Sequence, residues 1–252
     1  MAEGQIALVT GAGSGIGKAV ATALVQDGWH TVFTGRRLDK LEEAASAAIS
    51  SGSGKALPIA CDVSKSDEVD RLFQRIKSEF GRLDLLFNNA GMGYKSTTID
   101  EIPVEVWHDV VGVNLTGSFL CARGAFSMMR HQAPMGGRII NNGSISAYAP
   151  RPGSVPYTVT KHAITGLTKT LALDGRPFDI ACGQIDIGNA LTEMAAPMTK
   201  GVPQANGDIA VEAVMDVGRV SDAVRHMASL PLDANVLFMT VMATKMPFVG
   251  RG

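Results

Sequence analysis

Tyr157 and Lys161 are the two side chains of this sequence best suited to move a proton together. They stand four residues apart at the start of a predicted helix, so both side chains lie on one face, one turn apart. An ammonium group beside a phenol favours the phenolate, which allows tyrosine to act as an acid or a base near neutral pH. Taken alone, the spacing more often means a half-exposed tyrosine and a solvated lysine.

The glycine-rich run Gly11–Gly17 predicts a site for a nucleotide. It reads Gly-Ala-Gly-Ser-Gly-Ile-Gly and joins an apolar, strand-like run to a helical pattern. Glycines allow a tight turn that brings the backbone close to phosphate, and the free N–H groups and dipole of the following helix favour negative charge. A glycine-rich turn without a ligand is the less favoured alternative. The run indicates a nucleotide and leaves the reaction open.

Asn88–Gly91 and Ser144 complete a set of four motifs. The first reads Asn-Asn-Ala-Gly and follows the predicted fourth strand, and Ser144 precedes Tyr157 by thirteen residues. Together with the Thr-Gly-x-x-x-Gly-x-Gly run that starts at Thr10 and the Tyr-x-x-x-Lys pair, they have the order and spacing of the short-chain dehydrogenase/reductase family. The chain resembles that family, in its single-domain form, over roughly residues 5 to 192.

The resemblance implies a role for each polar residue of these motifs. Tyr157 would give a proton to a carbonyl or take one from an alcohol, and Ser144 would hydrogen-bond the substrate oxygen. Lys161 would bind the nicotinamide ribose and favour the phenolate. Asn114, in the predicted long fourth helix, would hold a water molecule of the proton relay, and its apolar neighbours favour its burial. Ser146 could replace Ser144, but the thirteen-residue interval favours Ser144.

The end of the second predicted strand indicates which dinucleotide binds. A carboxylate there accepts hydrogen bonds from the ribose 2′-OH of NAD and repels the 2′-phosphate of NADP. This sequence has Gly35-Arg36-Arg37 instead, and a guanidinium pairs well with phosphate. NADP is therefore expected, and NAD is the weaker alternative. Both arginines could instead be solvated, and Ser14 stands where some NADP-dependent relatives carry a basic residue.

Other cofactor contacts follow from the resemblance. Asp62 resembles the family residue that accepts from the adenine amino group, although an ordinary turn aspartate is an equal alternative. The family's Pro-Gly-x-x-x-Thr motif reads Ile-Gly-Asn-Ala-Leu-Thr from Ile187, so we expect Ala190 and Thr192 to hold the carboxamide less rigidly than with proline. The predicted cofactor-binding residues are Gly11, Ser14, Gly15, Ile16, Gly17, Arg36, Arg37, Asp62, Val63, Asn89, Ala90, Gly91, Tyr157, Lys161, Gly188, Ala190 and Thr192.

The elements that must position these residues alternate between short apolar runs and longer runs of helical period, which is the pattern of repeated βαβ units. Strands are expected at Gln5–Thr10, Thr31–Thr34, Ala56–Ala60, Leu83–Phe87, Arg138–Asn142, Asp179–Gln184 and Val236–Met242. Helices are expected at Ile16–Asp27, Arg37–Ser51, Ser66–Phe80, Pro103–His131, Tyr157–Leu173 and Ser221–Leu230. The strands are apolar on both faces, so an α/β fold is expected, with a Rossmann-type, doubly wound, parallel seven-stranded sheet and helices on both faces. We expect residues 1–252 to form a single domain.

Two C-terminal segments depart from simple patterns. Residues 187–217 lack sustained periodicity over about 30 residues, against a usual loop of about 4–6. We expect them to cover the substrate and to contain one or two short helices. The run from Ala243 to Gly250 replaces the family's usual Val-Asp-Gly-Gly ending.

Composition excludes several classes of partner. The 252 residues carry 23 basic and 24 acidic side chains, with no basic cluster longer than a pair, so neither nucleic acid nor an anionic membrane is an expected partner. The longest uncharged run has fourteen residues, short of the ~20 that a spanning helix needs, and no signal peptide is expected. The histidines lack the spacing of a metal site, so no metal is expected. Cys61, Cys121 and Cys182 fit buried free thiols in a reducing compartment, by default the cytoplasm.

These observations favour an NADP-dependent oxidoreductase that transfers hydride between nicotinamide and a small-molecule carbonyl or secondary alcohol. The predicted catalytic residues are Asn114, Ser144, Tyr157 and Lys161. The alternatives are an NADP(H)-binding regulator or scaffold without turnover and an NAD-preferring dehydrogenase. From the family, a homodimer or homotetramer is expected, paired through helices Pro103–His131 and Tyr157–Leu173.

Overall fold

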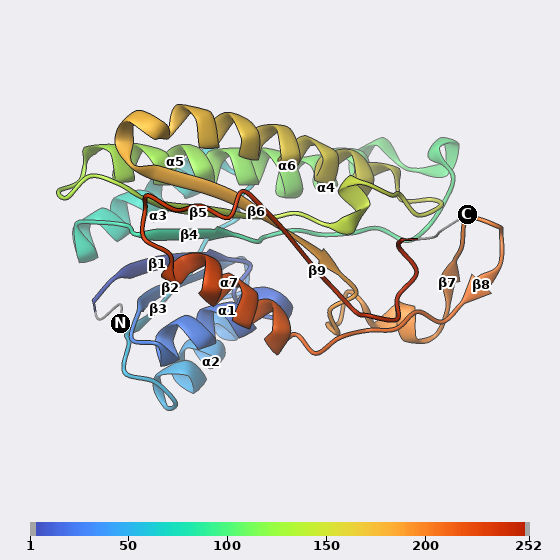
Figure 1. The fold of residues 1–252 in the computed structure, drawn as a ribbon, viewed down its shortest axis with the longest axis horizontal. Helices are drawn as coiled ribbons and strands as arrows, with labels where there is room; N and C mark the ends of the chain where they lie inside the picture. Colours follow the sequence, from blue (N-terminus) through green and yellow to red (C-terminus); the bar gives the residue numbers. More distant parts are fainter. Residues whose placement is uncertain (1–3, 250–252) are drawn as a thin grey trace.

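A parallel seven-stranded sheet forms the centre of the computed structural model, which describes residues 4–249 (Figure 1). Its strands are β1 (Ile6–Thr10), β2 (His30–Gly35), β3 (Ala56–Ala60), β4 (Leu85–Asn88), β5 (Gly137–Asn142), β6 (Ile180–Gly188) and β9 (Phe238–Met242). Their order is β3-β2-β1-β4-β5-β6-β9, and every neighbouring pair is parallel. The expected doubly wound sheet is confirmed. The order reverses between β1 and β4, and such sheets bind ligands beyond the carboxyl ends of the strands at this point.

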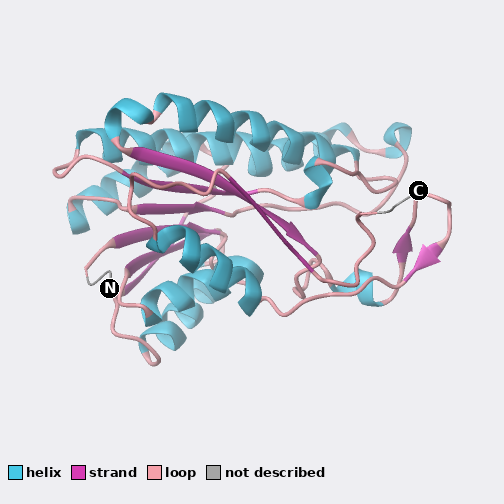
Figure 2. Cartoon of the chain, in the orientation of Figure 1, coloured by secondary structure: helices cyan, strands magenta, loops and turns pink. Residues whose placement is uncertain are grey.

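Helices cover both faces of the sheet (Figure 2). The helices α1 (Gly15–Gln26), α2 (Leu38–Ile49) and α7 (Gly218–Ser229) pack on one face. The other face carries α3 (Ser66–Phe80), α4 (Val104–Val111), α5 (Ser118–His131) and α6 (Val155–Asp174). Short 3-10 helices lie at Ile99–Glu101, Ile145–Ala147, Arg176–Phe178 and Ala196–Thr199. None of the helices within residues 4–249 has the length and apolarity to cross a bilayer.

The strands are apolar on both sides because alternate residues enter two different cores. In β1, Ala7 and Val9 pack under α1, α2 and α7, whereas Ile6 and Leu8 pack under α3 and α5. Successive side chains of a strand point to opposite faces, so a central strand between two helical layers needs an uninterrupted apolar run. The two helical layers hold the sheet in place, and with it the ends of the strands, where the predicted motifs lie.

The prediction of one uninterrupted α-helix from Pro103 to His131 is wrong. The chain keeps a helical path there, but a π-helical segment, Gly112–Gly117, separates α4 from α5. Gly117 allows a close approach, because a Cβ there would lie 2.7 Å from Val63 Cγ2. Asn114 lies within the widened segment, and π segments of this kind occur often at functional sites.

The sixth strand is longer than predicted, since β6 runs to Gly188 and not to Gln184. It pairs with β9 throughout this extension, from Gln184 opposite Phe238 to Gly188 opposite Met242. Proline cannot donate to a strand ladder, whereas Ile187 has a backbone N–H. The replacement of the family's proline therefore removes a reason for the strand to stop.

Residues 187–217 contain one short helix, as expected, and a small ribbon that was not expected. The described part has the 3-10 helix Ala196–Thr199 and an antiparallel ribbon of β7 (Val202–Pro203) and β8 (Ile209–Ala210). The ribbon projects at the end of the molecule beyond β9 (Figure 1). Residues 1–3 and 250–252 of the predicted domain, including Gly250 of the atypical C-terminal run, lie outside the described residues.

Candidate active site

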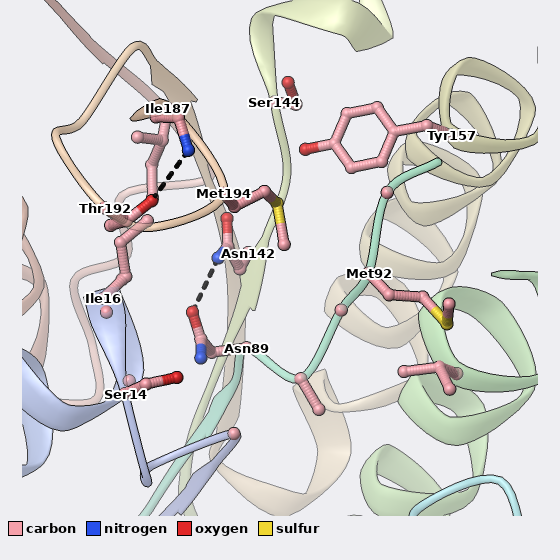
Figure 3. Close-up of a pocket in the computed structure, with 18 of the residues that line it drawn as sticks. Ser14, Ile16, Asn89, Met92, Asn142, Ser144, Tyr157, Ile187, Thr192 and Met194 are labelled. Atoms are coloured by element: carbon pink, nitrogen blue, oxygen red, sulfur yellow. Dashed lines mark hydrogen bonds between the residues drawn. The ribbon is translucent and has the colours of Figure 1, made fainter. Parts of the chain in front are cut away.

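A cavity of ≈ 880 Å³ opens beyond the carboxyl ends of β1, β4, β5 and β6, where the strand order reverses (Figure 3). Among the predicted site residues, Asn114 and Gly188 do not line it. The predicted residues that do are Gly11, Ser14, Gly15, Ile16, Gly17, Arg36, Arg37, Asp62, Val63, Asn89, Ala90, Gly91, Ser144, Tyr157, Lys161, Ala190 and Thr192. The fold thus brings together motifs that are far apart in the sequence.

The glycine run forms a cradle that side chains would fill. Gly11 and Gly15 have φ of +69° and +51°, a conformation that favours glycine. A Cβ on Gly17 would lie 2.3 Å from the carbonyl oxygen of Gly11. Ser14 is the N-cap of α1, and its side chain makes no capping hydrogen bond within residues 4–249. The first N–H groups of α1 are therefore available to a phosphate, so the residues present fit a dinucleotide.

Thr10 ties the glycine cradle to the next strand. Its hydroxyl accepts from the backbone N–H groups of Asn89 and Ala90, each at 2.8 Å, and its carbonyl accepts from Asn89 Nδ2 at 2.8 Å. The Asn89 Oδ1 atom in turn accepts from Asn142 Nδ2 at 2.8 Å (Figure 3). The ends of β1, β4 and β5 are thereby held in fixed relation beneath the cavity.

The helix α6 presents Tyr157 and Lys161 together, as predicted. Tyr157 is half-buried in the first turn, and Lys161 lies one turn later with its Nζ 5.5 Å from the phenol ring centroid. Lys161 is only 6% exposed, and its Nζ donates to the carbonyl oxygen of Asn142 at 2.7 Å. The alternative of a solvated lysine is therefore wrong. The ammonium is held against the tyrosine by β5.

Ser144 follows β5 and faces the same cavity (Figure 3). Its hydroxyl accepts from the N–H of Ser146 at 3.1 Å, which caps the 3-10 helix that follows. The hydroxyl keeps its own hydrogen to donate, as binding to a carbonyl oxygen requires. Its backbone N–H donates to Asp186 Oδ1 at 3.0 Å.

Asn114 is buried beside the cavity, as its apolar neighbours predict. Its Oδ1 accepts from the N–H of Met92 at 2.8 Å, and its Nδ2 donates to the carbonyl of Met92 at 2.9 Å and to Thr160 Oγ1 at 3.2 Å. The side chain therefore fixes the segment that follows Asn88–Gly91. Its role in holding a water molecule stays a prediction.

Arg36 and Arg37 are exposed side chains that line the cavity after β2. Asp62 lines it after β3, and its Oδ1 accepts from the N–H and hydroxyl of Ser64 at 3.0 and 2.7 Å. Burial would raise the pKa of Asp62, but these hydrogen bonds and the charge of Arg36 hold it below its usual value. Asp62 makes the contact typical of a turn aspartate, and its role toward adenine stays a prediction.

Gly188 is buried by the C-terminal segment and does not reach the cavity. A Cβ there would lie 2.7 Å from Met246 Sδ and 2.8 Å from Met242 Cβ. Close packing against these two methionines therefore explains why residue 188 is a glycine. Ala190 and Thr192, further along the same segment, line the cavity as predicted.

The sequence alone does not identify the individual side chains that line the part of the cavity where a substrate would bind, here called the substrate side. Met92, Tyr94, Met194 and Met198 line it, as does Arg151. These residues lie in segments without a sustained periodic pattern, which is why the sequence does not single them out. Arg151 brings a charged side chain to this part of the lining.

The charge of Arg151 is paired inside the protein. Its Nη2 contacts Glu212 Oε2 in an ion pair and donates to Asn189 Oδ1 at 2.9 Å. Burial alone would raise the pKa of Glu212, but hydrogen bonds from Asn189, Gln204 and Arg151 lower it. Glu212 is therefore an anion that balances the arginine, and the pair joins the loop after Ser144 to residues 187–217.

Cys61, Cys121 and Cys182 are buried free thiols, as predicted. Burial raises the pKa of Cys61 and of Cys182 to about 12, so both stay protonated and unreactive. Location in the cytoplasm stays a prediction. Within residues 4–249, no group of three or more His, Cys, Asp or Glu side chains could hold a metal ion.

Comparisons with known proteins agree with this geometry. The model of the family described as short chain dehydrogenase matches residues 5–203. A 3beta-hydroxysteroid dehydrogenase of Mediterraneibacter gnavus is 38% identical over 181 residues, which make up 72% of this chain and 64% of that protein. The chain therefore spans less than two thirds of that relative's length. The protein belongs to the short-chain dehydrogenase/reductase family.

Solved structures give the same result. L-sorbose reductase from Gluconobacter frateurii, complexed with NADPH and L-sorbose, superimposes with a TM-score of 0.85 at 28% identity, over 98% of this chain and 97% of that chain. A 3-ketoacyl-(acyl-carrier-protein) reductase from Brucella melitensis, complexed with NADH, gives 0.84 at 26% identity, over 96% and 98%. Family membership and these neighbours support an oxidoreductase with a nicotinamide cofactor.

Proposed function

We propose that the protein is an NADP-preferring oxidoreductase that interconverts a carbonyl compound and a secondary alcohol, with Tyr157 as the proton donor or acceptor. One observation carries the proposal. Tyr157 of α6 and Ser144, which follows β5, line the same cavity, and the buried Lys161 lies one turn beyond the tyrosine. A regulator that only bound a dinucleotide would not need this arrangement.

The chain's own residues can handle the substrate oxygen and its proton. Ser144 donates a hydrogen bond to the oxygen, and Tyr157 gives it a proton in reduction or removes one in alcohol oxidation. Lys161, held by the Asn142 carbonyl, stabilises the negative charge that the tyrosine carries between these steps. When bound, a nicotinamide cofactor supplies or takes up the hydride.

NADP is proposed because of the charges around the cofactor end of the cavity. The glycine cradle and the open N-terminus of α1 would hold the pyrophosphate, and Arg36 would pair with the 2′-phosphate. Gly35 at the end of β2 offers no carboxylate to bind the ribose 2′-OH of NAD.

The substrate side favours a neutral, medium-sized and mostly apolar carbonyl compound. Three methionines and Tyr94 line it, and methionine adapts its shape to irregular apolar groups. Because Glu212 neutralises Arg151, the cavity offers no strong attraction to a carboxylate or phosphate on the substrate. The relatives named above act on molecules as different as a steroid and a sugar, so the choice rests on this lining.

The test is turnover with a panel of ketones, aldehydes and oxoacyl thioesters, followed by the oxidation of NADPH. The wild-type protein should reduce at least one neutral ketone, and Tyr157→Phe should lower kcat at least a hundredfold while NADPH still binds, because phenylalanine keeps the ring without the proton. Near-normal turnover by Tyr157→Phe would refute the role of the tyrosine. Tight NADPH binding without turnover on the whole panel would instead favour a regulator.

A further inference from the structure

Asp186 is a fully buried carboxylate on β6 that lies directly behind Ser144 and does not line the cavity. Its Oδ1 accepts from the N–H of Ser144 at 3.0 Å and from Gln184 Nε2 at 2.7 Å, and its Oδ2 accepts from the hydroxyl of Tyr148 at 2.8 Å. Burying a carboxylate is costly unless hydrogen bonds compensate, and three donors converge on this one.

Gly143 makes room for this carboxylate. A Cβ at position 143 would lie 2.0 Å from Asp186 Oδ1 and 2.7 Å from Gln184 Nε2. The N–H of Gly143 donates to the carbonyl of Ile185 at 2.8 Å, so the peptide stays in place beside β6. The missing side chain at 143 and the acid at 186 are therefore complementary, and together they shape the turn that presents Ser144.

The same group of hydrogen bonds reaches the helix that carries Tyr157 and Lys161. Gln184 Nε2 also donates to Thr165 Oγ1 at 3.2 Å, and Gln184 Oε1 accepts from Thr168 Oγ1 at 3.0 Å. Both threonines belong to α6. Burial raises the pKa of Asp186, while its hydrogen bonds and the charge of Lys161 oppose this. Asp186 thus links the Ser144 turn to α6 through Gln184.

We propose that Asp186 is a positioning residue that acts through Ser144. By fixing the N–H of Ser144 against β6, its Oδ1 sets the direction of the serine hydroxyl, whose free hydrogen must meet the substrate oxygen. The inference rests on the proposed function, since it concerns how that site holds its substrate. A carboxylate that lies outside the cavity thereby affects the rate of the reaction inside it.

Two substitutions separate the hydrogen bond from the charge. In Asp186→Asn, the Oδ1 atom can still accept from Ser144 and Gln184, and the new amide can donate to the Tyr148 oxygen. In Asp186→Ala, the N–H of Ser144 loses its acceptor. Tyr148→Phe is the control, because it removes one donor to Asp186 and leaves the contact with Ser144 in place.

The measurements are kcat and KM with a ketone identified in the panel, and NADPH affinity by fluorescence. Asp186→Ala should lower kcat about tenfold to a hundredfold with unchanged NADPH affinity, because small misplacements of a reacting group have effects of this size. Asp186→Asn and Tyr148→Phe should stay within about threefold of wild type. Normal kcat in Asp186→Ala, or an equal loss in Asp186→Asn, would overturn the proposal.

A measurement without substrate keeps the proposal testable if no ketone is turned over. Hydrogen exchange of the Ser144 amide should be slow in the wild type, Asp186→Asn and Tyr148→Phe, and faster in Asp186→Ala. Equal protection in all four proteins would refute the contact on which the proposal depends. Failure of the proposed function would instead appear as absent turnover with the exchange pattern intact.

Discussion

In the proposed function, the choice between NADP and NAD depends most on Arg36. It is exposed directly after β2 and lines the cavity, and no ion pair holds its guanidinium within residues 4–249, so it can reach a phosphate. Hydrogen bonds to a charged group contribute about 1.5–3 kcal/mol. A phosphate contact of this size would decide the preference between the two dinucleotides.

Arg36→Ala should therefore weaken NADPH binding about tenfold to a hundredfold and change NADH binding by less than about threefold. Isothermal titration of both cofactors measures this difference. Lys40→Ala is a suitable control, because Lys40 pairs with Glu43 and is not part of the cavity lining. Equal losses of both cofactors in Arg36→Ala would exclude contact with the 2′-phosphate.

Individual residues could be predicted where the chemistry lies within one short motif. The partnership of Tyr157 with Lys161 and the glycine cradle of Gly11–Gly17 depend on local spacing and on the elements next to them. The contact of Ser144 with Asp186 depends on the register between β5 and β6, which local spacing does not reveal. The pairing of Arg151 with Glu212 depends in the same way on how an irregular segment folds back.

Among the elements, residues 187–217 are fastened over the cavity by the pair Arg151 and Glu212. Removing Arg151 breaks its ion pair with the buried Glu212, which is costly, and loosens this segment from the loop after Ser144. The segment should then open more often. Its opening can be followed at Lys200, an exposed lysine within it.

Arg151→Met should increase trypsin cleavage at Lys200 about tenfold and raise the KM for the ketone, because the segment closes less firmly over the substrate. Arg219→Met, which removes an exposed ion pair with Asp222, should leave both unchanged. Cleavage at the wild-type rate in Arg151→Met would show that other contacts hold the segment.

The apolar patterns predict well which segments are helices and which are strands, but they do not predict two details of these elements. A period of 3.6 residues is nearly unchanged by a single widened turn, so the π segment Gly112–Gly117 was hidden within a helical pattern. The end of β6 at Gly188 could not be predicted either, because its extension carries the charged residue Asp186. Its burial depends on donors from the segment after β5 and from Gln184 of the same strand, which the sequence alone does not bring together.

At the scale of the whole molecule, the outer faces of α5 and α6 carry exposed apolar side chains. Phe119 is 49% exposed on α5, and Val159 and Leu173 are 44% and 57% exposed on α6. Exposed apolar side chains on these two helices fit a contact with a second copy, and closed symmetric assemblies are the commonest arrangement. We therefore propose a homodimer or homotetramer that uses this face.

Light scattering should find an oligomer for the wild type, and Phe119→Glu with Val159→Glu should reduce it to a smaller species. Ile49→Glu on α2, a position 50% exposed, is the control and should leave the mass unchanged. An oligomer of unchanged size in the double variant would place the interface elsewhere. A monomeric wild type would refute the assembly itself.

The strand order has a kinetic consequence. The central pairing joins β1 to β4, with Ala7 opposite Leu85, and the chain between them forms β2 and β3. Contacts between such distant parts of a chain form slowly, because the closure of a long loop precedes any gain from pairing. The glycine cradle meets Asn89 through this pairing, and Ser144 and Tyr157 come from elements still further along the chain. The ability to bind a dinucleotide should therefore appear late in folding, after most of the helical structure has formed.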